Sequence, residues 1–154
     1  MIQTLEPSIH ELPFFSDLAD PHLKLLMSCA ENVHFPAQHY IFREGDPANK
    51  FYVIRDGLVS VELYIPGRGV AIVQTVGQGE VVGWSWVSPP YRWHFEARTL
   101  LETSALVFDA NWLRSKWKED HDFGYEMMKR FADVIATRLD ATRLQLLDMY
   151  AGLP

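Results

Sequence analysis

The sequence predicts a mainly β domain, a jelly-roll β-barrel (double-stranded β-helix) with an N-terminal helix and a long C-terminal helix. Three observations favour this fold. The chain has 154 residues, the usual size of one domain. Its central zone, about 33–108, contains several short strand patterns separated by glycine-containing turns. The next zone, about 109–150, carries helical patterns instead. We therefore expect one domain over residues 1–154.

The composition is that of a globular protein and excludes several functional classes. Hydrophobic residues make up 48% of the chain, which excludes a disordered or fibrous protein. The net charge of −6 disfavours nucleic acid as a partner, because an acidic surface repels phosphates. The single cysteine, Cys29, excludes an internal disulfide framework. No apolar run has the length of a membrane span, and no secretory-signal pattern is visible. We expect a cytoplasmic protein with no membrane partner.

An N-terminal helix is predicted to begin at Asp20 and Pro21. Asp20 would be the N-cap, and Pro21 is suited to the first helical position. The apolar residues that follow have the spacing of one buried helical face: Leu23, Leu26, Met27 and Ala30.

The pattern of the central zone predicts strands. Residues 59–65 alternate between apolar and polar side chains, the pattern of a strand with one buried face. The pair Asp56-Gly57 predicts a hairpin before this strand, and residues 66–69 and 77–79 predict two later turns. Further strands are expected at 93–99 and 103–108.

The C-terminal zone predicts a short helix capped by Asp109, a break near residues 120–122, and then a long helix. At 1.5 Å per residue the long helix would measure roughly 43 Å, about the diameter of the whole domain, so it spans the domain or projects from it. Its apolar residues exceed what one short domain can cover, which predicts a homodimer through this helix. These residues are Met128, Phe131, Ile135, Leu139, Leu146 and Met149.

Signals of catalysis are poor. Residues 83–87 begin like a nucleophile elbow around Ser85, but Val87 stands where the second glycine is required. The six histidines lack the spacing of a cupin metal triad, and Gly77 and Gly79 precede a strand pattern, not the helix that a dinucleotide site needs. We expect no enzyme activity, no metal and no cofactor.

Two features of the sequence are similar to those of a known family. One is the order of these elements, and the other is the pair of segments FREGD at residues 42–46 and FYVIRDGLVSV at 51–61. The chain resembles the cyclic nucleotide-binding domain, and more narrowly the sensor domain of Crp/Fnr-type regulators, from about residue 12 to 150. The resemblance implies a non-enzymatic regulatory domain with cyclic AMP or cyclic GMP as candidate ligands. Such regulators continue into a helix-turn-helix domain, which the sequence lacks before Pro154, so direct DNA binding is not expected.

The resemblance also implies a phosphate-binding cassette, and here the sequence departs from the family. In the family a Gly-Glu pair opens the cassette and an Arg closes it. When the cassette is aligned from its start, Trp84 stands at the position of the family's Glu. When it is aligned from its end, Tyr91 stands at the position of the family's Arg, and Arg92 falls one residue late. The loop is also two to three residues shorter than usual. A shift of one residue turns a side chain to the other face of a strand.

Two interpretations of this loop remain open. In the first, it lines a pocket for a small anionic ligand, with Thr142 and Arg143 on the long helix where the family contacts the purine. The candidate residues are Gly83, Trp84, Ser85, Tyr91, Arg92, Thr142 and Arg143. In the second, the five aromatic residues between 84 and 95 fill the pocket, and the domain is a ligand-free dimerisation or protein-interaction module.

Overall fold

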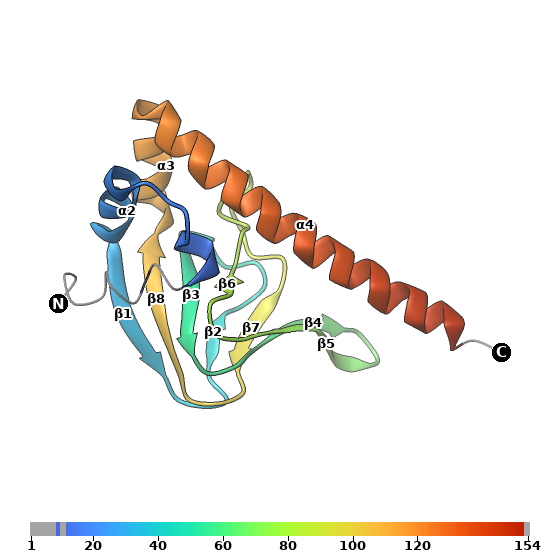
Figure 1. Ribbon diagram of the computed structural model, residues 1–154. Coiled ribbons are helices and arrows are strands. Elements are labelled where there is room, and N and C mark those ends of the chain that lie inside the picture. Colours follow the sequence, from blue (N-terminus) through green and yellow to red (C-terminus); the bar gives the residue numbers. More distant parts are fainter. Residues whose placement is uncertain (1–8, 10–11, 153–154) are drawn as a thin grey trace.

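The strands form two four-stranded antiparallel sheets in the computed structural model, which describes Ile9 and residues 12–152 (Figure 1). The order in the first sheet is β1-β8-β3-β6 and in the second β2-β7-β4-β5. The strands of the first sheet are β1 (Ala30–Phe35), β3 (Lys50–Asp56), β6 (Val81–Val82) and β8 (Thr103–Asp109). Those of the second are β2 (Tyr40–Phe42), β4 (Val59–Ile65), β5 (Gly69–Val76) and β7 (Glu96–Thr99). The predicted jelly-roll architecture is confirmed.

In the sequence, helices come before and after the strands. The 3-10 helix η1 (Pro13–Phe15) and α2 (Asp20–Met27) come first, and α3 (Ala110–Glu119) and α4 (His121–Ala151) come last. Asp109 accepts a hydrogen bond from the Trp112 N–H at 3.1 Å, as predicted for the cap of the short helix. The N-cap of α2 is Ala19, not Asp20 as predicted; Asp20 lies in the first turn.

Aromatic side chains join the first sheet to α4. The ring of Phe51 on β3 stacks on Phe108 of β8 at 4.6 Å and on Trp86 at 5.0 Å. The ring of Phe131 on α4 meets Phe51 edge-on at 5.1 Å. All four side chains are fully buried, so the loop that contains Trp86, the sheet and α4 share one core.

The predicted alternation along β4 fails, because Ser60 and Glu62 are buried and Ile65 at the far end is exposed. The side chain of Arg98 on β7 explains the burial of Glu62, because Arg98 binds the Glu62 carboxylate at 2.7 Å. The far end of β4 belongs to the β4–β5 hairpin, which projects from the body of the molecule (Figure 1).

The predicted hairpin at Asp56-Gly57 is also wrong. The two residues form a turn, but β3 belongs to the first sheet and β4 to the second, so the turn carries the chain between sheets. Gly57 has φ +117°, and a Cβ there would lie 2.4 Å from Thr103 Oγ1 and 2.7 Å from the Glu102 carbonyl oxygen. Glycine is needed for the backbone conformation and for the space.

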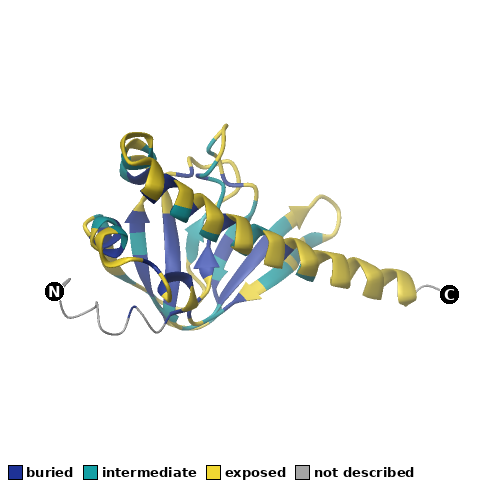
Figure 2. Cartoon of the chain, turned by 45° about the horizontal axis from the view of Figure 1, so that its top comes forward, coloured by how far each residue is buried: buried dark blue, intermediate teal, exposed yellow. Residues whose placement is uncertain are grey.

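Helix α4 crosses the molecule and continues past the sheets, one of the two outcomes that its length allowed (Figure 1). Figure 2 shows its last turns exposed all round, in contrast to the turns that lie over the sheets. Gln145 Nε2 donates to the Val73 carbonyl oxygen at 3.0 Å, which ties this part of α4 to β5. Among the helices of the described residues, none combines the length and apolar character of a membrane span.

Substituting Gly57 should destabilise the fold more than substituting a glycine with open space around it. We expect Gly57→Ala to lower the free energy of unfolding by about 3 kcal/mol, because the new methyl group meets backbone as well as an unfavourable φ. Gly67→Ala, at φ +82° with nothing within 4 Å, is the control and should cost about 1 kcal/mol. Urea unfolding measures both, and equal losses would contradict the steric argument.

Candidate functional site

The loop between β6 and β7 is built on a close contact between Gly83 and Trp93. Gly83 has φ +95°, and a Cβ on it would lie 2.5 Å from two carbons of the Trp93 indole. The indole in turn stacks on the ring of Phe42 at 3.8 Å with the two planes 9° apart. The glycine therefore allows the backbone to lie directly on the buried Trp93 ring.

A small cavity of about 20 Å³ lies beside this pair. It is formed by strand residues, the loop and one residue of α4: Phe42, Val61, Val82, Gly83, Trp84, Ser85, Trp93, Phe95 and Arg138. A volume of about one water-sized probe is far below the 300 Å³ or more of a typical ligand pocket. Aromatic side chains fill most of the space in this conformation.

The two tryptophans of the loop start have different surroundings. Trp86 is fully buried among Phe51, Phe131 and Trp117, with the Trp117 ring 5.2 Å away. Trp84 is only half-buried and lies over the cavity, with its ring 6.4 Å from Phe95. Trp86 therefore anchors the loop to the core, whereas Trp84 packs against the edge of that core and borders the cavity.

Arg138 is a functional candidate that the sequence reasoning missed. It reaches the cavity from α4, is 6% exposed, and donates through Nη2 to the Val81 carbonyl oxygen. Its Nη1 has no hydrogen-bond partner among the described residues. Its guanidinium carbon lies 5.2 Å from the centre of the Trp84 ring. Burial lowers the pKa of Arg138, an effect that the negative charge of Glu80 partly opposes.

A signal for Arg138 was present in the sequence. It follows Phe131 by seven residues, two helical turns, and so lies in line with the buried face of α4. An arginine at such a position indicates a charge that faces the protein interior.

Arg92 lies outside the cavity in this structure. Its side chain is exposed, and its Nη1 donates to the Gly45 carbonyl oxygen at 2.8 Å. Its backbone forms an isolated β-bridge with Pro47. Tyr91 next to it has φ +57°, and its ring lies under the Arg114 guanidinium at 4.2 Å. Neither residue is among those that line the cavity.

Thr142 and Arg143 lie one turn beyond Arg138 on the exposed part of α4. Thr142 Oγ1 donates to the Arg138 carbonyl oxygen at 2.9 Å, and Arg143 pairs with Asp140 at 3.6 Å. Of the predicted site residues, the structure thus brings Gly83, Trp84 and Ser85 together. A ligand role for any of the seven stays a prediction.

A family comparison identifies the fold that holds this loop. The family model of the cyclic nucleotide-binding domain matches residues 32–120. The chain belongs to the cyclic nucleotide-binding domain family.

Relatives of this family member include a CRP-like cAMP-activated global transcriptional regulator from Mycobacterium tuberculosis. The two are 29% identical over 117 residues, which is 76% of this chain and 50% of the regulator. The chain therefore matches about half the length of that curated relative.

Solved structures show the same fold. A cyclic nucleotide-binding domain from Methylobacillus flagellatus superposes with a TM-score of 0.80 at 19% identity, covering 96% of this chain and 83% of that one. The catabolite activator protein of Thermus thermophilus superposes with a TM-score of 0.70 at 21% identity, covering 90% of this chain and 63% of the other.

The two aromatic residues that border the cavity should contribute unequally to the stability of this domain. We expect Trp93→Ala to lower the free energy of unfolding by about 3–5 kcal/mol, because Trp93 is buried and stacked on Phe42. Trp84→Ala should cost only about 1–2 kcal/mol, since this side chain is only partly buried. Guanidinium unfolding of the two variants tests this, and a larger loss for Trp84→Ala would show that Trp84 is a core residue and not a cover.

Proposed function

We propose that the chain is a non-enzymatic regulatory domain that binds a small anionic ligand between the cassette loop and α4. One observation carries the proposal: the cavity is bordered by the loop on one side and by Arg138 of α4 on the other. Family membership supports it, as does the similarity to the M. tuberculosis regulator, which is described as cAMP-activated. We expect no direct DNA partner, because the chain is acidic.

The mechanism would be a shift between two packings of α4. A ligand that touches both loop and helix binds one packing better than another, and this difference in affinity displaces the equilibrium. In the present packing Trp84 covers the cavity, so ligand binding requires the indole to move. The movement would be transmitted along the helix to its exposed end.

Cyclic AMP should bind more weakly than to a family member with an ordinary cassette. Trp84 stands where the family carries the Glu that accepts the ribose hydroxyl, and an indole offers no acceptor. Loss of a hydrogen bond to a charged group costs roughly 1.5–3 kcal/mol. This corresponds to about ten- to more than a hundredfold in affinity.

A titration with cyclic AMP and cyclic GMP tests this function. Because Trp84 must move, we expect either nucleotide to change tryptophan fluorescence, with dissociation constants in the high micromolar range or above, about 10⁻⁴ M. Trp84→Phe is the control that assigns the signal to this residue. Nanomolar binding would contradict the expected effect of the missing acceptor. If neither nucleotide gives a response in fluorescence or calorimetry, both are excluded as ligands.

The second candidate function is a ligand-free interaction module. The observation that favours it is the cavity volume of about 20 Å³, which holds no nucleotide as it stands. The same titration separates the two functions, because a module of this kind binds neither nucleotide.

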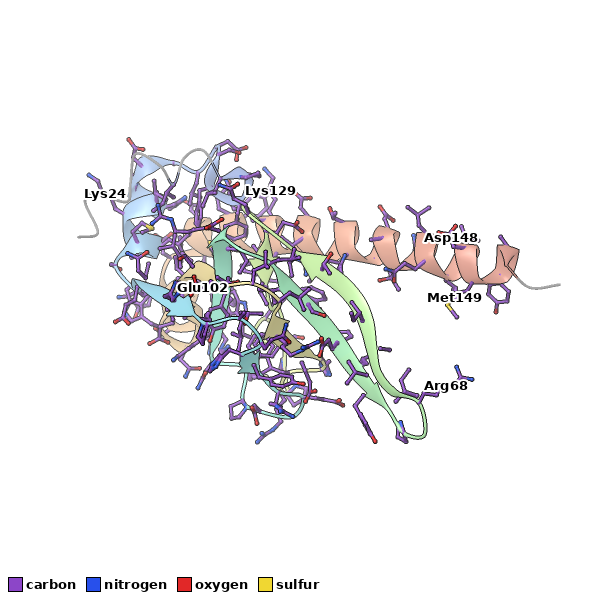
Figure 3. All side chains as sticks on the ribbon, turned by 90° about the horizontal axis from the view of Figure 1, so that it is seen from below. Lys24, Arg68, Glu102, Lys129, Asp148 and Met149 are labelled. Atoms are coloured by element: carbon purple, nitrogen blue, oxygen red, sulfur yellow. The ribbon has the colours of Figure 1, made fainter. Side chains whose placement is uncertain are left out.

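Under either function we propose that the chain forms a homodimer through α4. Large apolar side chains of its second half are about half exposed or more, Met149 to 70%. They are Leu139, Leu144, Leu146, Leu147, Met149 and Tyr150. Figure 3 shows Met149 projecting away from the helix at this end of α4. An uncovered apolar surface of this kind favours association.

Placing a charge on this surface should dissociate the dimer. We expect sedimentation velocity at about 100 µM to give a dimer for the wild type and a monomer for Leu146→Glu, because association would bury an unpaired carboxylate. Leu101→Glu is the matched control, since Leu101 is similarly exposed but lies in the loop between β7 and β8. A monomeric wild type, or a dimeric Leu146→Glu, would contradict the proposed interface.

A further inference from the structure

We propose that Arg138 is the anion-receiving group of the cassette cavity, and that Trp84 covers it until a phosphate-bearing ligand displaces the indole. This inference rests on the proposed function, and it names the residue and the ligand class of the same site. In the family the cation that binds the phosphate lies in the cassette loop, whereas here it lies on helix α4.

The hydrogen bonding of the buried Arg138 guanidinium is incomplete. Arg138 is 6% exposed, and its Nη2 donates to the Val81 carbonyl oxygen. Nη1 is buried and donates to nothing among the described residues. Buried charged groups are normally paired, and an unpaired donor carries a full desolvation cost. An anion at Nη1 would remove this cost.

The other arginines near the loop are already engaged. Arg98 binds the Glu62 carboxylate at 2.7 Å, and this hydrogen bond raises the pKa of Arg98. Arg114 donates to the Trp86 carbonyl oxygen at 2.6 Å, and Arg92 donates to that of Gly45. Arg138 differs from all three because it borders the cavity.

The surroundings of Arg138 decide the side from which an anion approaches. Arg138 also borders an outer groove of about 450 Å³ between η1, the turn before β6 and α4. That groove contains three carboxylates, from Asp17, Glu80 and Asp133, and its second cation, Arg130, is bound to Asp17 at 2.8 Å. The carboxylates repel an anion, whereas no residue that lines the cassette cavity is acidic.

Possible donors to a phosphate group lie in the residues that border the cavity. Beside Arg138, these residues include Gly83, Trp84 and Ser85, and Ser85 carries a hydroxyl. In the described part of the chain, the N–H groups of Trp84, Ser85 and Trp86 donate to no protein acceptor, while Val87 N–H donates to the Trp84 carbonyl oxygen. Phosphate oxygens accept from a guanidinium and from several N–H groups at once.

The Trp84 indole lies beside the Arg138 guanidinium in this structure. Its ring lies 5.2 Å from the guanidinium carbon of Arg138, a cation–π contact made by a partly buried side chain. Such a contact is weaker than a charge-assisted hydrogen bond to phosphate. A phosphate can therefore replace the indole, and its departure would enlarge the cavity to admit the rest of the ligand.

The test compares Arg138→Gln with Arg92→Gln, which removes an exposed guanidinium from the same loop. The probes are cyclic AMP, cyclic GMP and inorganic phosphate, with adenosine as an uncharged counterpart. Their binding is measured by calorimetry and by Trp84 fluorescence. We expect at least one anionic probe to bind the wild type and adenosine to bind more weakly. Arg138→Gln should weaken anion binding by about 10- to 100-fold, and Arg92→Gln by less than about twofold.

The outcomes separate this inference from the proposed nucleotide ligand. Phosphate binding that depends on Arg138, with both cyclic nucleotides silent, would support the anion site and exclude the nucleotides. Unchanged anion binding in Arg138→Gln would overturn the inference, as would loss of binding in Arg92→Gln alone. Absence of binding of every anion to the wild type at about 10 mM would also overturn it.

A spectroscopic measurement on the wild type covers the case in which Arg138→Gln does not fold. In protein labelled with ¹⁵N-arginine, the side-chain N–H signals of Arg138 should shift on addition of phosphate, and those of Arg92 should not. Arg138→Lys assigns the signal and keeps a positive charge at the position. An Arg138 signal that stays constant while a binding probe saturates the protein would overturn the inference.

Discussion

The position of every functional element depends on the stacking of aromatic rings around Phe51. Its ring contacts Phe108 in the same sheet, Trp86 in the cassette loop and Phe131 in α4. Three segments that are far apart in the sequence are thereby fixed to one buried side chain. Because protein interiors are closely packed, a change in the position of one of these rings must be accommodated by the others.

This constraint divides the cassette loop into a fixed and a free part. Trp86 is held in the core, and Arg114 of α3 donates to its carbonyl oxygen. Trp84, two residues earlier, borders the cavity, and its ring contacts Phe95 and the Arg138 guanidinium. The five aromatic residues of the loop therefore do not share one role: some complete the core, and at least Trp84 borders the site.

Local signals in the sequence were sufficient for the elements but not for their partners. The Asp109 cap, the break before α4 and the strand at residues 103–108 each depend on a few neighbouring residues. The Asp-Gly turn at residues 56–57 was predictable, but its crossing between sheets was not, since it depends on β7 and β8. Likewise, the burial of Glu62 depends on Arg98, which is 36 residues away in the sequence.

The site was predicted only in part because some of its residues depend on contacts between distant segments. Gly83, Trp84 and Ser85 follow from their position after β6, a local property. Arg138 faces the cavity because α4 docks across the sheets and its guanidinium reaches Val81, 57 residues earlier. The helical period could indicate that Arg138 faces inward, but not which loop it meets. A search limited to the cassette therefore selects Arg92, the one cation in the loop.

A cation on the helix instead of the loop changes what an anion would do to the domain. A ligand held by a loop arginine affects α4 only through the loop, whereas a ligand held by Arg138 acts on α4 directly. The same guanidinium already bonds the Val81 carbonyl oxygen on β6, so an anion at Nη1 would join the sheet, the loop and the helix at one group. Because Arg138 lies immediately before the exposed half of α4, its position bears directly on where that apolar surface points.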